Sequence, residues 1–262
     1  MSNEEAPPGI DTSVAHPARR YDYWLGGTVN FAADRASGDA IAAAFPSTRT
    51  AAVENRRFLQ RAVKYLFDSG IRQFLDVGTG IPSAGNVHEV APDARVVYVD
   101  NDPIVLLHAG PLLSRNTTYL EGDVRNPGEI LARAPLDFDQ PIGLLLFSVL
   151  HFLEDADSPY ARVAELVDAL APGSYLALSH GTIDHQTPEQ LEALAPIMAS
   201  TPGQFRSFAE VSRFFEGLEL VEPGLVSIAE WRASTDLSPG DVEMWGGVAR
   251  VGPLRTTDAQ LS

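Results

Sequence analysis

Residues 74–80 have the sequence FLDVGTG, a short and mostly apolar run that ends in two closely spaced glycines. An apolar run of this length is typical of a strand that is buried on both faces of a parallel sheet. The glycines allow a tight turn and a close approach of the backbone to a ligand, and the helix expected next would offer free N–H groups. An ordinary strand-to-helix turn has the same pattern, so the surrounding sequence decides between the two interpretations.

Strand and helix patterns alternate on both sides of this motif. A long helix is expected over residues 48–69, with Ser47 as its N-cap and Gly70 just beyond its end. Strands are expected at 95–99, 117–120, 142–147 and 175–179, with helices at 103–113, 128–133 and 160–170 between them. This alternation predicts an α/β fold with a doubly wound, parallel sheet.

The last part of the chain has a different order of elements. Helices are expected near 189–198 and 208–215, and two strand-like runs follow at 224–228 and 244–251. Because no clear helix separates these two runs, they are expected to pair as an antiparallel hairpin at the edge of the sheet.

The N-terminal part differs from the rest in composition. Residues 1–18 show little hydrophobic periodicity and are expected to form an arm. Residues 19–27, RRYDYWLGG, suit a lid over a ligand, and equally suit an amphipathic helix packed on the sheet, which could itself present Tyr21 or Gly26 to a ligand. We therefore expect an arm and lid-like helical segment over residues 1–47 and one α/β domain over 48–262.

Composition narrows the classes of function. The 262 residues are 45% hydrophobic, enough for one large core, and the lack of cysteine excludes disulfides and thiolate chemistry. A formal net charge of -16 disfavours nucleic acid and favours a small molecule or a protein as the partner. The histidines are scattered without the spacing of a metal site, so no metal is expected. A polar start and the lack of long apolar runs predict a cytoplasmic protein without a membrane segment.

Acidic residues at the ends of two predicted strands fit a nucleoside. Asp100 lies about 20 residues beyond the glycines, where its carboxylate can accept both hydroxyls of a ribose. Asp123 can accept from an exocyclic amine while the N–H of Val124 serves a ring nitrogen, as adenine requires, although a polar turn has the same pattern. Asp102 precedes Pro103 and is expected to cap a helix rather than to bind a ligand.

Four ordered segments resemble the motifs of class I S-adenosylmethionine-dependent methyltransferases: DVGTG (76–80), VDNDP (99–103), GDVR (122–125) and LLFSVLHFLED (145–155). This resemblance extends from residue 74 to the C-terminus. The segment IDTSVAHPARRYDYWLGG (10–27) further resembles a bacterial, actinobacterial-type methyltransferase family of unknown substrate. The resemblance implies a Rossmann-like methyltransferase fold with seven mostly parallel strands, an antiparallel last strand and an N-terminal helical extension.

The same resemblance implies how S-adenosylmethionine would be bound. Its amino-acid part would lie against Asp76, Gly78, Thr79 and Gly80, its ribose against Asp100, its adenine against Asn101, Asp123 and Val124, and its sulfonium side against Ser148. Pro82, which lacks an N–H, stands where the family often has a third glycine. Ser83 stands where a nicotinamide-binding motif has its third glycine, which disfavours a dehydrogenase.

The expected activity is methyl transfer to an unidentified acceptor, which we expect to be a small molecule. A general base would assist transfer to oxygen or nitrogen, and His151 and His180, after the fourth and fifth predicted strands, are the candidates. A histidine at the end of a strand also commonly makes a structural hydrogen bond. The alternative function is a non-catalytic regulatory protein that binds S-adenosylmethionine or S-adenosylhomocysteine, because a fold alone does not define an activity.

Overall fold

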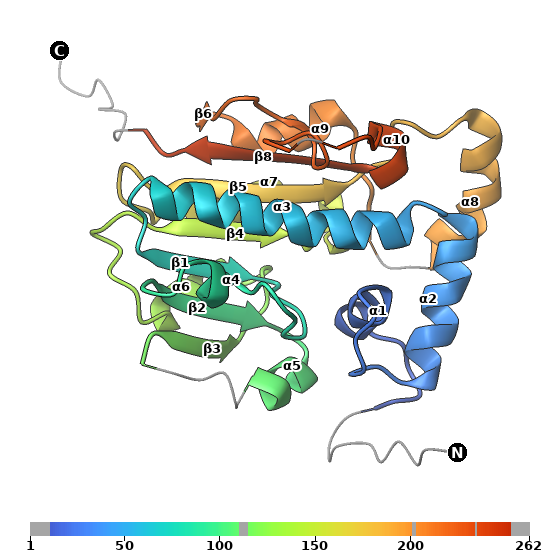
Figure 1. Cartoon of the computed structure of the whole chain (residues 1–262), viewed down its shortest axis with the longest axis horizontal. Helices are drawn as coiled ribbons and strands as arrows, with labels where there is room; N and C mark the ends of the chain where they lie inside the picture. Colours follow the sequence, from blue (N-terminus) through green and yellow to red (C-terminus); the bar gives the residue numbers. More distant parts are fainter. Residues whose placement is uncertain (1–10, 110–114, 201–202, 234, 253–262) are drawn as a thin grey trace.

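The computed structural model describes residues 11–109, 115–200, 203–233 and 235–252 (Figure 1). The strands are β1 (Gln73–Val77), β2 (Arg95–Asp100), β3 (Thr117–Glu121), β4 (Gly143–Phe147), β5 (Tyr175–Gly181), β6 (Glu219–Leu220), β7 (Val226–Ser227) and β8 (Met244–Arg250). The α-helices are α1 (Pro17–Trp24), α2 (Ala32–Ala44), α3 (Thr48–Asp68), α4 (Val87–Val90), α5 (Pro103–Ala109), α6 (Pro127–Arg133), α7 (Pro159–Asp168), α8 (Pro188–Ser200), α9 (Phe208–Ser212) and α10 (Pro239–Val242). Short 3-10 helices are η2 (Leu150–Phe152), η3 (Asp155–Asp157) and η4 (Arg213–Phe215).

Within the described residues, the strands form one sheet in the order β3-β2-β1-β4-β5-β8-β6, and β7 also pairs with β8. Strands β1 to β5 are parallel, and the order reverses between β1 and β4. β8 is antiparallel to β5, so that Tyr175 lies opposite Arg250 and Gly181 opposite Met244. The predicted α/β fold, with a mostly parallel sheet and an antiparallel last strand, is therefore confirmed.

One edge of the sheet differs in detail from the prediction. The run expected at 224–228 does pair with β8 in the antiparallel sense, but only Val226 and Ser227 form strand pairs. β6 pairs with the same edge of β8 and was not predicted, because its two residues are exposed and have no apolar pattern. Pro223, which has no backbone N–H, lies between these short strands, so the two together take the place of one interrupted strand.

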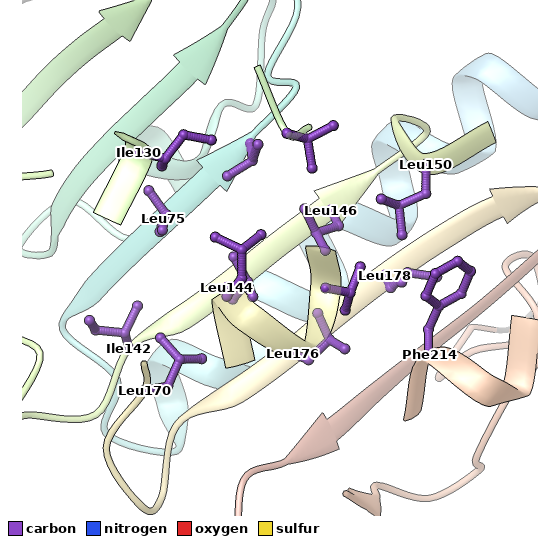
Figure 2. Close-up of a cluster of buried hydrophobic side chains, with 14 of the residues drawn as sticks. Leu75, Ile130, Ile142, Leu144, Leu146, Leu150, Leu170, Leu176, Leu178 and Phe214 are labelled. Atoms are coloured by element: carbon purple, nitrogen blue, oxygen red, sulfur yellow. The ribbon is translucent and has the colours of Figure 1, made fainter. Parts of the chain in front are cut away.

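Alternate side chains of the central strands face two separate cores. On one face, Leu144 and Leu146 of β4 pack with side chains from α6, α7 and η4 (Figure 2). On the other face, Leu145 and Phe147 pack in a cluster with Phe58 of α3. A strand that is covered on both faces needs an apolar residue at every position, which explains the continuous apolar run of β4.

The long predicted helix is confirmed as α3, and Gly70 follows it with a left-handed φ of 97°. The predicted N-cap is wrong in one respect: in the part of the chain that the structure describes, the Ser47 side chain makes no capping hydrogen bond. Its backbone is already helical, with φ -67° and ψ -17°, whereas a capping side chain normally belongs to an extended residue. Of the helix predicted at 103–113, α5 covers 103–109, and 110–114 lie outside the described residues.

The N-terminal helices lie beyond the carboxyl ends of the parallel strands. Figure 1 shows α1 and α2 on the side toward which the arrows of β1, β2, β4 and β5 point. Tyr21 of α1 donates from its hydroxyl to the carbonyl oxygen of Ala52 in α3 at 3.0 Å. The segment RRYDYWLGG therefore contributes to a packed helix, and this helix covers the edge of the sheet where a ligand is expected.

Candidate functional site

A cavity of about 440 Å³ opens at the carboxyl ends of β1, β2, β4 and β5, where the strand order reverses. Helices α1, α2 and α3 contribute to its walls, together with the loops that follow the strands. A cavity of roughly 300–1,000 Å³ at this place in a doubly wound sheet commonly binds a ligand. The predicted site residues that line it are Tyr21, Asp76, Gly78, Thr79, Gly80, Asp100, Asn101, Asp123, Val124, Ser148 and His151. Gly26 and His180 lie outside this lining.

Asp76 is a buried acid on the floor of the cavity. It is 3% exposed, and burial raises the pKa of its carboxyl to about 7, although Arg56 nearby favours the charged form. Thr79 donates from its hydroxyl to Asp76 Oδ2 at 3.2 Å. The protonation of Asp76 therefore changes near neutral pH.

The glycine turn begins at Gly78, two residues after Asp76. Gly78 and Gly80 have left-handed φ angles of 77° and 68°. The expectation that the next helix presents free N–H groups beside these glycines is wrong, because α4 begins only at Val87 and has four residues. Pro82 in the intervening loop has no N–H of its own. The turn is held instead by a side chain of the neighbouring strand.

That side chain is Asp100, at the end of β2. Its Oδ2 accepts from the N–H of Gly80 at 2.7 Å, and its Oδ1 accepts from the N–H of Asp102 at 2.9 Å. Burial raises the pKa of Asp100, while these two donors favour its ionised form. Asp102 Oδ1 accepts from the N–H of Ile104 at 3.0 Å, which confirms the predicted helix cap.

Asn101 and Asp123 meet at the same end of the cavity. Asn101 Nδ2 donates to Asp123 Oδ2 at 3.2 Å. The backbone N–H of Arg125 donates to Asp123 Oδ1 at 2.8 Å, and its guanidinium lies 3.3 Å from Oδ2. Val124, which lies between Asp123 and Arg125 in the sequence, is buried. The fold thus brings the residues predicted for ribose and adenine together.

A hydrogen-bond network connects α1 to the end of β4. Ser148, with a left-handed φ of 51°, donates from its N–H to Ser179 Oγ at 3.0 Å. Ser179 Oγ donates to Asn55 Oδ1 at 2.6 Å, and Asn55 Nδ2 donates to the hydroxyl of Tyr21 at 3.0 Å. Asn55 was not predicted, although a polar residue in line with Phe58 on the apolar face of a predicted helix is a usable signal.

The two candidate histidines occupy different places. His151 lines the cavity, and burial lowers its pKa to about 4. His180 has Nδ1 2.7 Å from the carbonyl oxygen of Gly181 and Nε2 3.1 Å from Nη1 of Arg206. Arginine can only donate, so Nε2 accepts and Nδ1 carries the proton. Both nitrogens of His180 are therefore used in structural hydrogen bonds, which does not favour the predicted role as a base.

The N-terminal extension is tied to the loop after β2. His16 Nδ1 lies 2.8 Å from Asp102 Oδ2, and Arg19 Nε lies 3.9 Å from the same oxygen. Two cavity-lining residues, Arg20 of α1 and Glu243 before β8, were not predicted. Glu243 has no local sequence signal, because only the antiparallel pairing of β8 brings it to the site.

The chain matches the model of a family described as S-adenosyl methyltransferase over residues 3–252, and it belongs to this family. A DUF574 family protein from Streptomyces avermitilis is 41% identical, with 92% of this chain and 99% of that chain covered and a TM-score of 0.86. A protein from Thermobifida fusca is also 41% identical, with 94% and 98% covered and a TM-score of 0.86. No match was found among curated proteins.

Family membership confirms both the Rossmann-like methyltransferase fold and S-adenosylmethionine as the cofactor. At lower similarity, the N-methyltransferase NodS from Bradyrhizobium japonicum is 16% identical over 76% of this chain and 97% of that chain. Its TM-score of 0.50 is a likeness of fold alone. In the segments that the structure describes, no helix combines the length and apolar character that crossing a membrane requires.

Proposed function

We propose that this chain transfers the methyl group of S-adenosylmethionine to a small-molecule acceptor. The proposal rests on one observation. A single cavity contains both the residues suited to the cofactor, at the ends of β1 to β3, and further space under α1 and α2. A single cavity can hold a donor and an acceptor side by side, and such positioning supplies a large part of the catalysis of group transfer.

The residues present fit the cofactor. Asp100 would bind the ribose, because a carboxylate that two backbone N–H groups hold in place still has lone pairs for two hydroxyls. We assign the adenine to Asn101, Asp123 and Val124, the amino-acid part to Asp76, Gly78, Thr79 and Gly80, and the sulfonium side to Ser148. Tyr21 would close the cavity from α1.

When bound, the cofactor supplies a methyl carbon that its sulfonium already makes electrophilic. The chain has to orient the acceptor and exclude water. Tyr21 and Trp24 of α1 line the cavity and cover it. His151, with a pKa of about 4, is neutral at neutral pH, so it can orient a polar group by a hydrogen bond but is a weak base.

Cofactor binding is expected to release protons near neutral pH. The pKa of Asp76 is about 7 in the ligand-free protein, and the ammonium group of the cofactor favours the ionised carboxylate. Affinity should therefore rise by at most about tenfold per pH unit as the pH approaches 7, and level off above it. Calorimetry in buffers with different ionisation enthalpies measures the released protons. Asp76→Asn should flatten the profile, and a variant that keeps the same pH dependence would contradict this role.

The proposed function is tested by calorimetric titration with S-adenosylmethionine, S-adenosylhomocysteine and NAD under one set of conditions. We expect about micromolar binding of the two sulfur compounds alone. Binding of NAD alone, or of none of the three, would contradict the proposal. Tight binding of the sulfur compounds without product in a broad acceptor screen would instead support a non-catalytic binding protein.

A further inference from the structure

Three buried polar atoms that belong to cavity-lining residues have no hydrogen-bond partner among the described residues. They are Nε of Arg20, Nδ1 of His151 and Oε2 of Glu243. Buried polar groups in folded proteins are nearly always paired, because an unpaired one loses its hydration without compensation. Three such atoms around one cavity indicate a polar ligand.

The strand order separates these atoms from the residues assigned to the cofactor. Asp100 and Asp123 follow β2 and β3, on one side of the switch between β1 and β4. His151 follows β4 and Glu243 precedes β8, on the other side. The unpaired atoms of these two residues therefore lie on the other side of the switch from the residues assigned to the ribose and adenine, the side on which Ser148 is assigned to the sulfonium.

His151 and Glu243 each lie beside the end of β5. A Cβ atom on Gly181 would lie 3.8 Å from Nδ1 of His151. The next residue, Thr182, donates from its N–H to the carbonyl oxygen of Glu243 at 2.9 Å. Because Gly181 and Thr182 are consecutive, the same short piece of backbone holds both polar residues at the cavity.

Arg20 supplies a buried positive charge. It is 8% exposed, and its Nη1 donates to Ser37 Oγ at 3.3 Å. Within the described ranges no carboxylate lies within ion-pair distance of its guanidinium. Asp34, whose charge acts on Arg20, already accepts from the N–H groups of His16 and Phe31, each at 2.8 Å. An anionic ligand would supply the missing partner.

Arg20 and His151 line the cavity from two different elements. The positive charge of Arg20 contributes to lowering the pKa of His151, after burial and Arg206. Both residues line the cavity, Arg20 from α1 and His151 from η2. The cationic group and the unpaired ring nitrogen can therefore contact one small ligand.

Glu243 supplies an acid that is close to its own titration point. Gln186 Nε2 donates to Oε1 of Glu243 at 2.8 Å. Burial, together with the charge of Asp184, raises the pKa of Glu243 to about 7, against the opposing effects of Gln186 and the backbone N–H of His185. A carboxyl group with this pKa is partly ionised at neutral pH, and its ionised form can accept a proton from a ligand.

The walls between these polar groups are apolar and partly aromatic. Phe45 and Phe205 have ring centroids 5.5 Å apart, and both line the cavity. Phe205 also lies against Gly181, where an added Cβ would come within 3.0 Å of its ring. Trp24 and Ile41 complete this part of the lining. Such walls suit a flat apolar body.

We propose that this end of the cavity binds a small aromatic carboxylate that carries an O–H or N–H group. Arg20 holds the carboxylate, the aromatic side chains hold the ring, and Glu243 accepts a hydrogen bond from the O–H or N–H group, which is the nucleophile. This inference rests on the proposed function, and it names the class of the methyl acceptor.

The transfer balances with these groups. A lone pair of the acceptor oxygen or nitrogen forms the bond to the methyl carbon, and the bond from that carbon to sulfur breaks with its electron pair on sulfur. The products are the methylated acceptor and S-adenosylhomocysteine. The proton of the O–H or N–H group passes to the carboxylate of Glu243 and then to solvent.

The test uses the full chain saturated with S-adenosylhomocysteine and four probes: para-hydroxybenzoate, para-aminobenzoate, benzoate and phenol. Ligand-observed NMR and calorimetry measure their binding. We expect the two substituted benzoates to bind, benzoate to bind more weakly and phenol to bind least. Arg20→Met should lower the affinity for the two substituted benzoates by about tenfold or more. Glu243→Gln should lower it to the affinity for benzoate. Arg115→Met and Glu219→Gln, which change the same charges at exposed positions, are the matched controls.

Three results would overturn this proposal while leaving the proposed function intact. The first is tight binding of S-adenosylhomocysteine without binding of any probe, and the second is equal binding of the probes to Arg20→Met and to the original protein. The third is a weakened binding of S-adenosylhomocysteine by Arg20→Met with unchanged binding of methylthioadenosine, which lacks the carboxylate. Arg20 would then bind the cofactor rather than the acceptor. Failure of the original protein to bind S-adenosylhomocysteine would instead contradict the proposed function itself.

Discussion

Asp100→Ala is expected to weaken the binding of S-adenosylmethionine by roughly 10- to 100-fold. In the proposed site its carboxylate accepts from both ribose hydroxyls, and loss of charge-assisted hydrogen bonds costs on the order of 1.5–3 kcal/mol. The same carboxylate holds the N–H groups of Gly80 and Asp102, so the substitution also removes a support of the glycine turn. Titration calorimetry with S-adenosylmethionine measures the effect.

Two further variants accompany Asp100→Ala: a control at an exposed aspartate, and a substitution that removes only the charge of Asp100. Asp93→Ala removes an exposed aspartate from the loop before β2 and should bind the cofactor as the original protein does. Asp100→Asn keeps an oxygen that can accept from the backbone but removes the charge, so its affinity should lie between those of the original protein and Asp100→Ala. Full affinity of a folded Asp100→Ala protein for S-adenosylmethionine would show that Asp100 does not bind the ribose.

The positions of the central strands in the sequence were predictable because these strands are buried on both faces. Such strands have apolar side chains at every position, as in β4, and are visible in the sequence without knowledge of their neighbours. β6 lacks this signal, because it has two residues and both are exposed. The run at 224–228 was predicted to pair with the last strand, but the sequence did not indicate that only Val226 and Ser227 would form strand pairs.

The residues of the site also fall into those that the sequence predicts and those that it does not. Asp76, Asp100 and Asp123 were predictable as part of the cavity because each lies at the end of a parallel strand, and parallel strands end at one edge of the sheet. Arg20 and Glu243 reach the cavity through the packing of α1 and the antiparallel return of β8, which sequence spacing does not encode. Position in the sequence brings His180 to the correct edge too, but its side chain points into contact with Arg206 instead.

The N-terminal extension contributes residues to the lining of the cavity. Tyr21 bonds to Asn55 of α3, and His16 pairs with Asp102, the residue next to those that we assign to the adenine and ribose. Removing residues 1–47 as a domain would therefore leave the cofactor loop without partners that the structure shows in place. This argues for keeping the full chain in every binding experiment.

Gly78→Ala is expected to destabilise the protein by about 2–5 kcal/mol. A left-handed φ of 77° costs an L-residue roughly 1–2 kcal/mol, and the added methyl group would press on Val149, coming within 2.6 Å of its Cβ. Overpacking of this kind costs about 1–3 kcal/mol. The loss should appear as a lower midpoint of urea unfolding, measured without ligand.

Gly80→Ala is the matched control for this effect, because it separates backbone strain from overpacking. Gly80 has a similar φ of 68°, but a Cβ added there would meet no other described heavy atom within 4 Å. Only the strain of roughly 1–2 kcal/mol should remain. Adding Val149→Ala to Gly78→Ala removes Cγ2, the atom nearest to the new methyl group, but keeps Cβ, so it should recover only part of the loss. Equal destabilisation by Gly78→Ala and Gly80→Ala would show that contact with Val149 does not contribute to the loss of stability.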